Sequence, residues 1–216
     1  MLKHSLINSS IGKKMLVALA GGFLMIFLLV HLSINLLLLV GDQGILFNQA
    51  AHFMASNFII LKMQFVLAFA LLLHVAVAIF LSLQNWLARP DRYIVENSTE
   101  TNFFSKYMTH TGGIIFVFLI IHLLNFFYKM KFTGMDENQS FDLVSGLFRQ
   151  WQYSAFYIVS MLFLGFHLNH AFQSAFQTLG FNHNRYTPAI KVISTTYAVI
   201  VSVGFIMIPL YFLLVK

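Results

Sequence analysis

Five long apolar stretches constrain this chain more than any other feature. Each one exceeds the roughly 20 residues that a helix needs to cross a bilayer, and short polar connections separate them. Only 9% of the 216 residues are charged, whereas about a quarter are charged in a soluble domain. Backbone polar groups in lipid must be satisfied internally. The sequence therefore predicts an all-α, multi-pass membrane bundle of five transmembrane helices.

The predicted spans form a single membrane domain over residues 1–216. Their expected limits are about 14–40, 58–87, 107–128, 153–178 and 189–214. The four connections contain residues typical of turns: Gly41–Asp42, Arg89–Pro90–Asp91, Gly134–Met135–Asp136 and Thr187–Pro188.

Lysine and arginine predict the orientation of the bundle. They gather before the first span and in the second and fourth connections: Lys3, Lys13, Lys14, Arg89, Arg92, Lys106, Arg185 and Lys191. In the third connection Lys129, Lys131 and Arg149 stand among the acidic residues Asp136, Glu137 and Asp142. The positive-inside rule then predicts a cytoplasmic N-terminus. As a separate expectation, the chain belongs to the inner (cytoplasmic) membrane of a cell. The net charge of +6 is explained by topology and not by nucleic-acid binding.

One histidine lies deep inside each of the first four spans: His31, His74, His122 and His167. Ionisable groups at membrane depth are expensive, rare and usually functional. The intervals are 43, 48 and 45 residues (31 to 74, 74 to 122, 122 to 167), so the four lie at comparable depths. We interpret them as two pairs of axial ligands that hold two b haems.

The chemistry of the chain favours imidazole ligation. There is no cysteine, which excludes thiolate ligands and an iron–sulfur cluster of the chain's own. At a helical rise of about 1.5 Å per residue, the first and third histidines lie a few Å further out than the second and fourth. This difference in depth is comparable to the uncertainty of the span limits, and it favours, without deciding, the pairs His31 with His122 and His74 with His167. For the second ring nitrogen we expect an acceptor four residues earlier in each helix, on Phe27, Ala70, Phe118 and Phe163.

Alternatives remain open for several of these residues. Membrane histidines also serve as interhelical hydrogen-bond partners or in proton relays. His170 lies one turn after His167 and could replace it as ligand, or contact a haem propionate or a quinone. Four further histidines are expected in loops or at helix ends: His4, His52, His110 and His183. Of these, His52 and His110 are candidates to lie near a ligand bound at the level of the lipid headgroups. The glycines at positions 21, 22, 112, 113 and 165 suit either close approach of a macrocycle or helix packing.

Several local sequences resemble the di-haem cytochrome b membrane anchor of succinate dehydrogenase and fumarate reductase, in the variant where one polypeptide forms the whole anchor. The resemblance covers nearly the full chain. It is carried by Ser10-Ile11-Gly12-Lys13-Lys14, Gly21-Gly22 before His31-Leu32-Ser33-Ile34-Asn35-Leu36, Phe47-Asn48 before His52-Phe53, Gly165-Phe166-His167 running on to Phe172-Gln173-Ser174-Ala175-Phe176, and Gly180-Phe181-Asn182-His183 before Tyr186-Thr187-Pro188.

The resemblance implies the same pairing of histidines and a role in electron transfer. It implies a flavoprotein and an iron–sulfur subunit on the cytoplasmic face, and a membrane quinone, commonly menaquinone, as substrate. The chain would not oxidise succinate by itself. One departure is that Ala51–Ala55 has no acidic residue where some fumarate reductases of this type carry a glutamate near the outer start of the second span. The alternatives are a haem b subunit of a hydrogenase or nitrate reductase, and a colourless transporter that relays protons.

Overall fold

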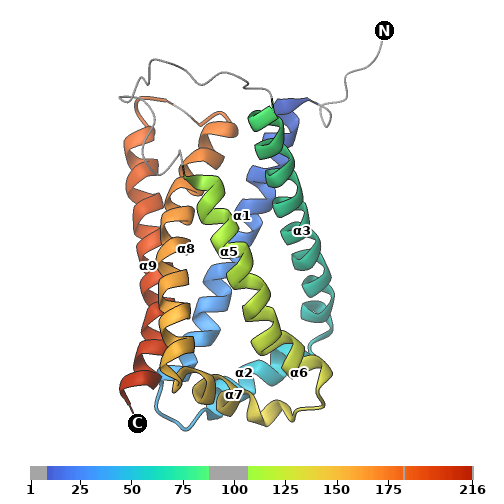
Figure 1. Ribbon diagram of the computed structural model, residues 1–216, viewed down its shortest axis with the longest axis vertical. Coiled ribbons are helices and arrows are strands. Elements are labelled where there is room, and N and C mark those ends of the chain that lie inside the picture. Colours follow the sequence, from blue (N-terminus) through green and yellow to red (C-terminus); the bar gives the residue numbers. More distant parts are fainter. Residues whose placement is uncertain (1–8, 88–106, 182, 216) are drawn as a thin grey trace.

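The computed structural model describes residues 9–87, 107–181 and 183–215. Within them, five helices are long and apolar enough to cross a membrane: Ser10–Leu39, Phe58–Leu87, Met108–Phe132, Trp151–Thr178 and Thr187–Leu214. The helices stand together in one bundle (Figure 1), and no strand occurs among the described residues. The prediction of an all-α, five-span architecture is confirmed, with limits that differ from the expected ones by at most four residues.

Some of the predicted features lie outside the described residues. These are His4, Lys3 and the basic residues and turn of the second connection, Arg89, Arg92, Lys106 and Arg89–Pro90–Asp91.

Side chains at the helix starts explain where the first two spans begin. Helix α1 (Ser10–Asn35) is capped by Ser9, whose Oγ accepts a hydrogen bond from the Gly12 N–H at 3.0 Å. Helix α3 (Phe58–Leu87) is preceded by Asn57, whose Oδ1 accepts from the Ile59 N–H at 3.0 Å. Both side chains satisfy N–H groups that lack a partner in the first turn of a helix.

Two of the predicted turns are confirmed and one is wrong. A 3₁₀ helix, η2 (Leu36–Leu39), ends α1 before Gly41, which has a φ of +81°, and Gly134 has a φ of +68°. Positive φ favours glycine because it has no Cβ. By contrast, Thr187 and Pro188 form the first turn of α9 (Thr187–Leu214). Proline suits this position because the N–H that it lacks would have no helical partner there.

Two short helices that the sequence analysis did not predict cover one end of the bundle. Helix α2 (Ile45–Ser56) and helix α7 (Ser140–Phe148) lie in the first and third connections (Figure 1). Asn48 of α2 joins the two connections. Its Nδ2 donates to the Asn138 carbonyl at 2.6 Å, and its Oδ1 accepts from the Phe141 N–H at 2.9 Å. The Phe141 ring also packs directly on Gly44.

The third span changes its helical geometry directly after His122. It consists of α5 (Met108–His122), the π-helical segment η3 (Leu123–Tyr128) and α6 (Lys129–Phe132). Within the π-helical segment, Asn125 Nδ2 donates to the Tyr157 hydroxyl of α8 at 3.2 Å. Segments of π-helix are rare and are often found at functional sites.

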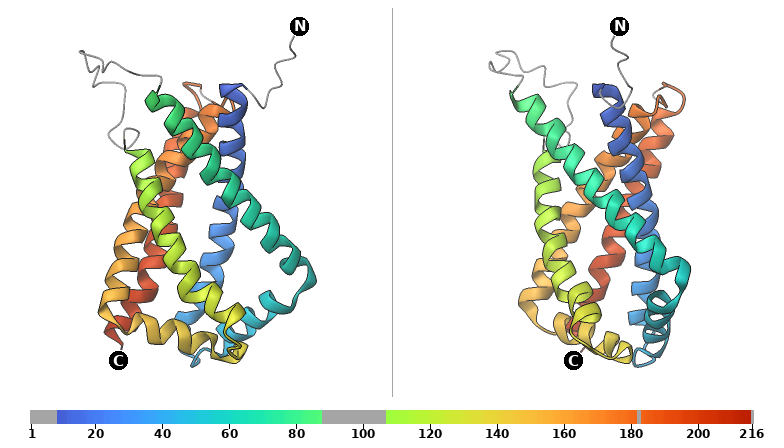
Figure 2. Two further views of the ribbon diagram at one scale, coloured as in Figure 1. Left: turned by 45° about the vertical axis from the view of Figure 1, so that its right-hand side comes forward. Right: turned by 90° about the vertical axis from the view of Figure 1, so that its right-hand side faces the viewer.

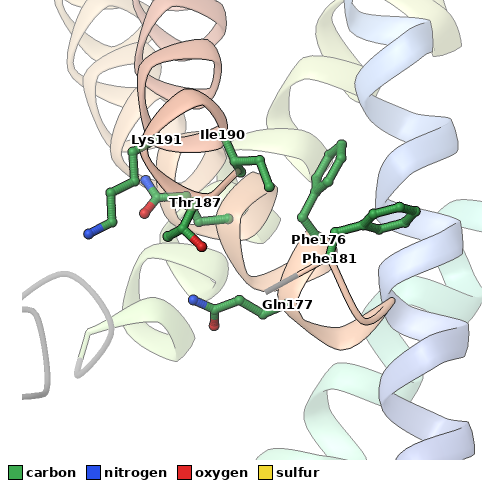
Figure 3. A pocket seen from close by; sticks show the side chains of 7 residues that line it. Phe176, Gln177, Phe181, Thr187, Ile190 and Lys191 are labelled. Carbon is green, nitrogen blue, oxygen red and sulfur yellow. The ribbon is translucent and has the colours of Figure 1, made fainter. Parts of the chain in front are cut away.

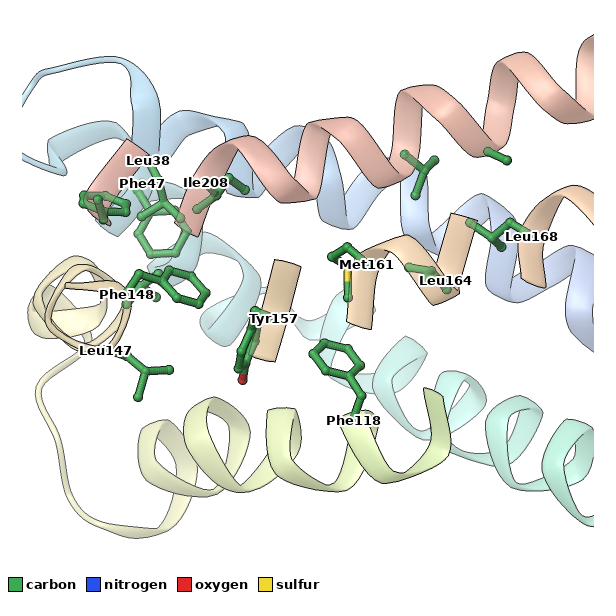
Figure 4. Packing of buried hydrophobic residues seen from close by; sticks show 14 residues of the cluster. Leu38, Phe47, Phe118, Leu147, Phe148, Tyr157, Met161, Leu164, Leu168 and Ile208 are labelled. Carbon is green, nitrogen blue, oxygen red and sulfur yellow. The ribbon is translucent and has the colours of Figure 1, made fainter. Parts of the chain in front are cut away.

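Helix α8 (Trp151–Thr178) is the centre of the packing, because it contacts α1, α5 and α9. In the core, Tyr157, Met161 and Leu164 of α8 lie beside Phe118 of α5 (Figure 4). On its other side α8 approaches α9 closely. A Cβ on Gly165 would lie 2.9 Å from Ser202 Oγ, as expected where small residues let membrane helices meet.

The four histidine-bearing helices contact one another in the order α3, α1, α8, α5. Helix α3 packs on α1 and α2 and diverges from α5 toward the end that α2 and α7 cover (Figure 2). The histidines of this set therefore come from helices that share one interior.

Candidate functional site

The His31 ring of α1 and the His122 ring of α5 are neighbours in the bundle. Their centroids are 5.9 Å apart and the rings are nearly perpendicular, at 89°. A phenylalanine one turn earlier stacks on each ring. Phe27 lies 5.2 Å from His31, and Phe118 lies 5.6 Å from His122, centroid to centroid. The two imidazoles are thus held face-on by aromatic side chains of their own helices.

The separation of this pair is the one that shared binding of a metal ion would require. If each imidazole bound the same ion at a metal–nitrogen distance of about 2 Å, the two ring centroids would lie about 6 Å apart. The observed 5.9 Å matches that separation. In addition, His122 Nδ1 is buried and has no hydrogen-bond partner, the one such side-chain atom found among the described residues. A buried polar atom without a partner is a reason to look for a further group at the site.

The His74 ring of α3 lies against the backbone of α1. Its Nδ1 is 3.2 Å from the Val17 carbonyl oxygen. The ring reaches this carbonyl because the facing residue is glycine: a Cβ on Gly21 would lie 3.2 Å from His74 Cε1.

The His167 ring of α8 lies against α5 in a similar way. Its Nδ1 is 3.3 Å from Thr111 Oγ1, and a Cβ on Gly112 would lie 3.5 Å from its Cε1. The structure therefore places the His74 and His167 rings against neighbouring helices of the same bundle, and the role of all four histidines as ligands stays a prediction.

The expected carbonyl four residues earlier is wrong for Nδ1 of all four histidines, and His122 Nδ1 has no partner among the described residues. His74 and His167 use Val17 and Thr111 of neighbouring helices, where Ala70 and Phe163 were expected. These contacts are possible because the residues that face the two rings, Gly21 and Gly112, have no side chain. For His31, the contact of Nδ1 is Asn35 Nδ2 at 3.5 Å; the same amide donates to the His31 carbonyl at 2.7 Å.

The other described histidines lie nearer the surface. His170 is partly buried on α8 and interacts electrostatically with His167, so it remains the alternative ligand. His52 and His110 are exposed, and His183 Nδ1 accepts from the Arg185 N–H in the α8–α9 connection.

The glycines divide into three groups. Gly21 and Gly112 face histidine rings, whereas Gly165 faces α9. Gly22 and Gly113 have open space, since a Cβ on either would meet nothing within 4 Å. Each glycine pair thus supplies one position that accommodates an imidazole.

Among the described residues, hollows lie at both ends of the bundle. The first, about 10 Å³, lies between α8 and α9 beside Phe176, Phe181 and Lys191 and has room for little more than a water molecule (Figure 3). The second is an open hollow of about 320 Å³, lined by Ile45, Asn48, Gln49, His52 and Asn138. Ligand sites have volumes of about 300–1,000 Å³. No acidic side chain lines it among the described residues.

Comparison of the chain with known protein families, with curated proteins and with solved structures finds no match. No cluster of three or more histidine, aspartate or glutamate side chains that could hold a metal ion occurs in the described part of the chain.

The sequence analysis missed the groups that touch the imidazoles. Val17, Asn35 and Thr111 were not singled out. A main-chain carbonyl has no sequence signature. Thr111 has a weak one, because it is a hydroxyl directly before a Gly–Gly pair in an apolar helix.

Proposed function

We propose that this protein is a di-haem cytochrome b that carries electrons across a membrane. His31 and His122 would hold one b haem, and His74 and His167 the other. The observation that carries the proposal is the 5.9 Å separation of the His31 and His122 rings across α1 and α5, with a second pair on α3 and α8. Each haem, when bound, supplies a one-electron redox centre.

The residues of the chain hold and shield these centres. The two imidazoles of each pair would hold one iron and leave it no ligand position for oxygen, which suits electron transfer. Phe27 and Phe118 stack on the outer pair of rings and keep them oriented. The apolar core around Tyr157 and Met161 separates that pair from water.

We further propose that the chain is the membrane anchor of a succinate:quinone oxidoreductase. The resemblance described above supports this assignment. A flavoprotein subunit and an iron–sulfur subunit would bind its cytoplasmic face and exchange electrons with quinone, most simply menaquinone, through the haems. That face would be the one with Lys13, Lys14, Arg185 and Lys191, and the positive-inside rule supports a cytoplasmic N-terminus. The membrane is then the inner membrane of the cell.

The first experiment is to purify the complex in mild detergent and determine its haem content. A reduced-minus-oxidised spectrum with a pyridine haemochrome assay should give two b haems per chain. A colourless protein would contradict the proposal and favour histidines that relay protons. The subunits that co-purify separate the related possibilities: a flavoprotein supports the succinate:quinone assignment, whereas hydrogenase or nitrate reductase subunits would replace it.

A further inference from the structure

The His74 and His167 rings share a feature that the other pair lacks. In each, Nδ1 lies beside an oxygen atom of a neighbouring helix, Val17 O for His74 and Thr111 Oγ1 for His167. A neutral imidazole carries one proton, and the hydrogen bond made by one nitrogen decides which nitrogen is left to bind a metal. The chemical nature of these two oxygens therefore determines the tautomers.

For His74 the tautomer follows from the partner alone. The Val17 carbonyl is only an acceptor, so a hydrogen bond over the observed 3.2 Å requires the proton on Nδ1. Gly21 makes this hydrogen bond possible, because the side chain of a larger residue would come between the His74 ring and the α1 backbone.

For His167 the tautomer follows from the single proton of the threonine hydroxyl. Thr111 Oγ1 is 2.9 Å from the Met108 carbonyl oxygen and 3.3 Å from His167 Nδ1. A carbonyl cannot donate, and threonine in a helix commonly donates to a carbonyl of the preceding turn. Because the Thr111 hydroxyl donates its only hydrogen bond to the Met108 carbonyl, its oxygen accepts a hydrogen bond from His167 Nδ1–H. The Met108 carbonyl itself lies beside the ring, and it too can only accept.

We propose that Thr111 and the Val17 carbonyl are positioning groups that hold the protons of His167 and His74 on Nδ1, so that Nε2 of both rings is already free to bind iron. The pair His31 and His122 has no equivalent acceptor: His122 Nδ1 has no partner among the described residues, and the contact of His31 Nδ1 is an amide nitrogen. The inference deepens the proposed function and rests on it where iron is concerned.

The test compares Thr111→Val with Thr111→Ser in the purified complex. Valine has the shape of threonine without the hydroxyl, and serine restores the hydroxyl. Loss of groups that orient a metal ligand costs about 10–100-fold in metal affinity. Thr111→Val should therefore speed transfer of one of the two haems to apomyoglobin by about that factor. It should also raise the midpoint potential of the same haem, because an imidazole that no longer donates from Nδ1 is a weaker electron donor. Thr111→Ser should restore both values.

A matched control separates this role from packing. Thr178 on α8 donates to a carbonyl of its own helix, Ser174, at 2.8 Å, and Thr178→Val should change neither haem. The inference would be overturned if Thr111→Val changed the midpoint potentials and transfer rates of both haems equally. It would also be overturned if these quantities stayed at their wild-type values.

The tautomer can also be measured without haem. In the haem-depleted full chain labelled with ¹⁵N-histidine, the His167 signal is identified by its loss in His167→Gln. Its ring shifts should show the proton on Nδ1, and Thr111→Val should reduce that population. A proton on Nε2 in the wild-type chain would contradict the inference. Because this measurement needs no haem, it stays informative if the purified protein proves colourless, which would overturn only the proposed function.

Discussion

Gly21 of α1 lies directly against the His74 imidazole of α3, so that a Cβ at position 21 would stand 3.2 Å from Cε1 and 3.4 Å from Nδ1. Contacts this short require the neighbour to move. The neighbouring Gly22 has no atom within 4 Å of a Cβ at its own position. Two adjacent glycines therefore have different roles, and they provide a matched pair of variants.

Gly21→Val should displace the His74 ring from the Val17 carbonyl and remove one haem. The expected content is one b haem per chain in place of two, measured by pyridine haemochrome. Gly22→Val, with the same loss of flexibility in the same helix, should keep both. Equal haem contents in the two variants would show that His74 does not need this glycine.

Single substitutions of the histidines should divide them into two pairs. His31→Ala and His122→Ala should each remove the same haem, and His74→Ala and His167→Ala the other, as seen in redox titrations of the remaining absorbance. His110→Ala, which changes an exposed histidine, is the control and should retain both haems. If His170→Ala lost a haem while His167→Ala did not, His170 would be the ligand.

Asn48→Ala should loosen the end of the bundle that α2 and α7 cover. It removes the hydrogen bonds to Asn138 and Phe141 and leaves their main-chain groups without this partner. The expected cost is about 1–3 kcal/mol in the free energy of unfolding, seen as a lower midpoint of thermal unfolding in detergent. Gln49→Ala, at an exposed position of the same helix, should leave the midpoint unchanged. The same midpoint in both variants would rule out a stabilising role for Asn48.

Gly165→Leu should separate α8 from α9. The added side chain would meet Ser202, whose Oγ lies 2.9 Å from the position of a Cβ. Overpacking of this kind costs about 1–3 kcal/mol, measurable by the same thermal assay. Gly113→Leu, where a Cβ meets nothing within 4 Å, is the matched control. A Gly165→Leu variant as stable as the control would show that the helices can move apart at little cost.

The spans were predictable because their causes are local. A helix in lipid must satisfy its own backbone hydrogen bonds, so the five apolar stretches determine five helices whatever their neighbours are. The expected span 58–87 coincides with α3, and the others differ by a few residues. Helices α2 and α7 were missed because they are short segments in the connections, where tertiary contacts such as those of Asn48 stabilise them.

The sequence by itself therefore determined the five spans and placed one histidine in each of four of them. Only the tertiary structure decided what each imidazole touches. The contacts of His74 with Val17 and of His167 with Thr111 join residues 57 and 56 positions apart, and they depend on how α3 crosses α1 and how α8 crosses α5. Spacing along a helix fixes the depth of a side chain in the membrane. The partner of that side chain depends on the packing between helices, which is set by glycine and other small residues at their contacts.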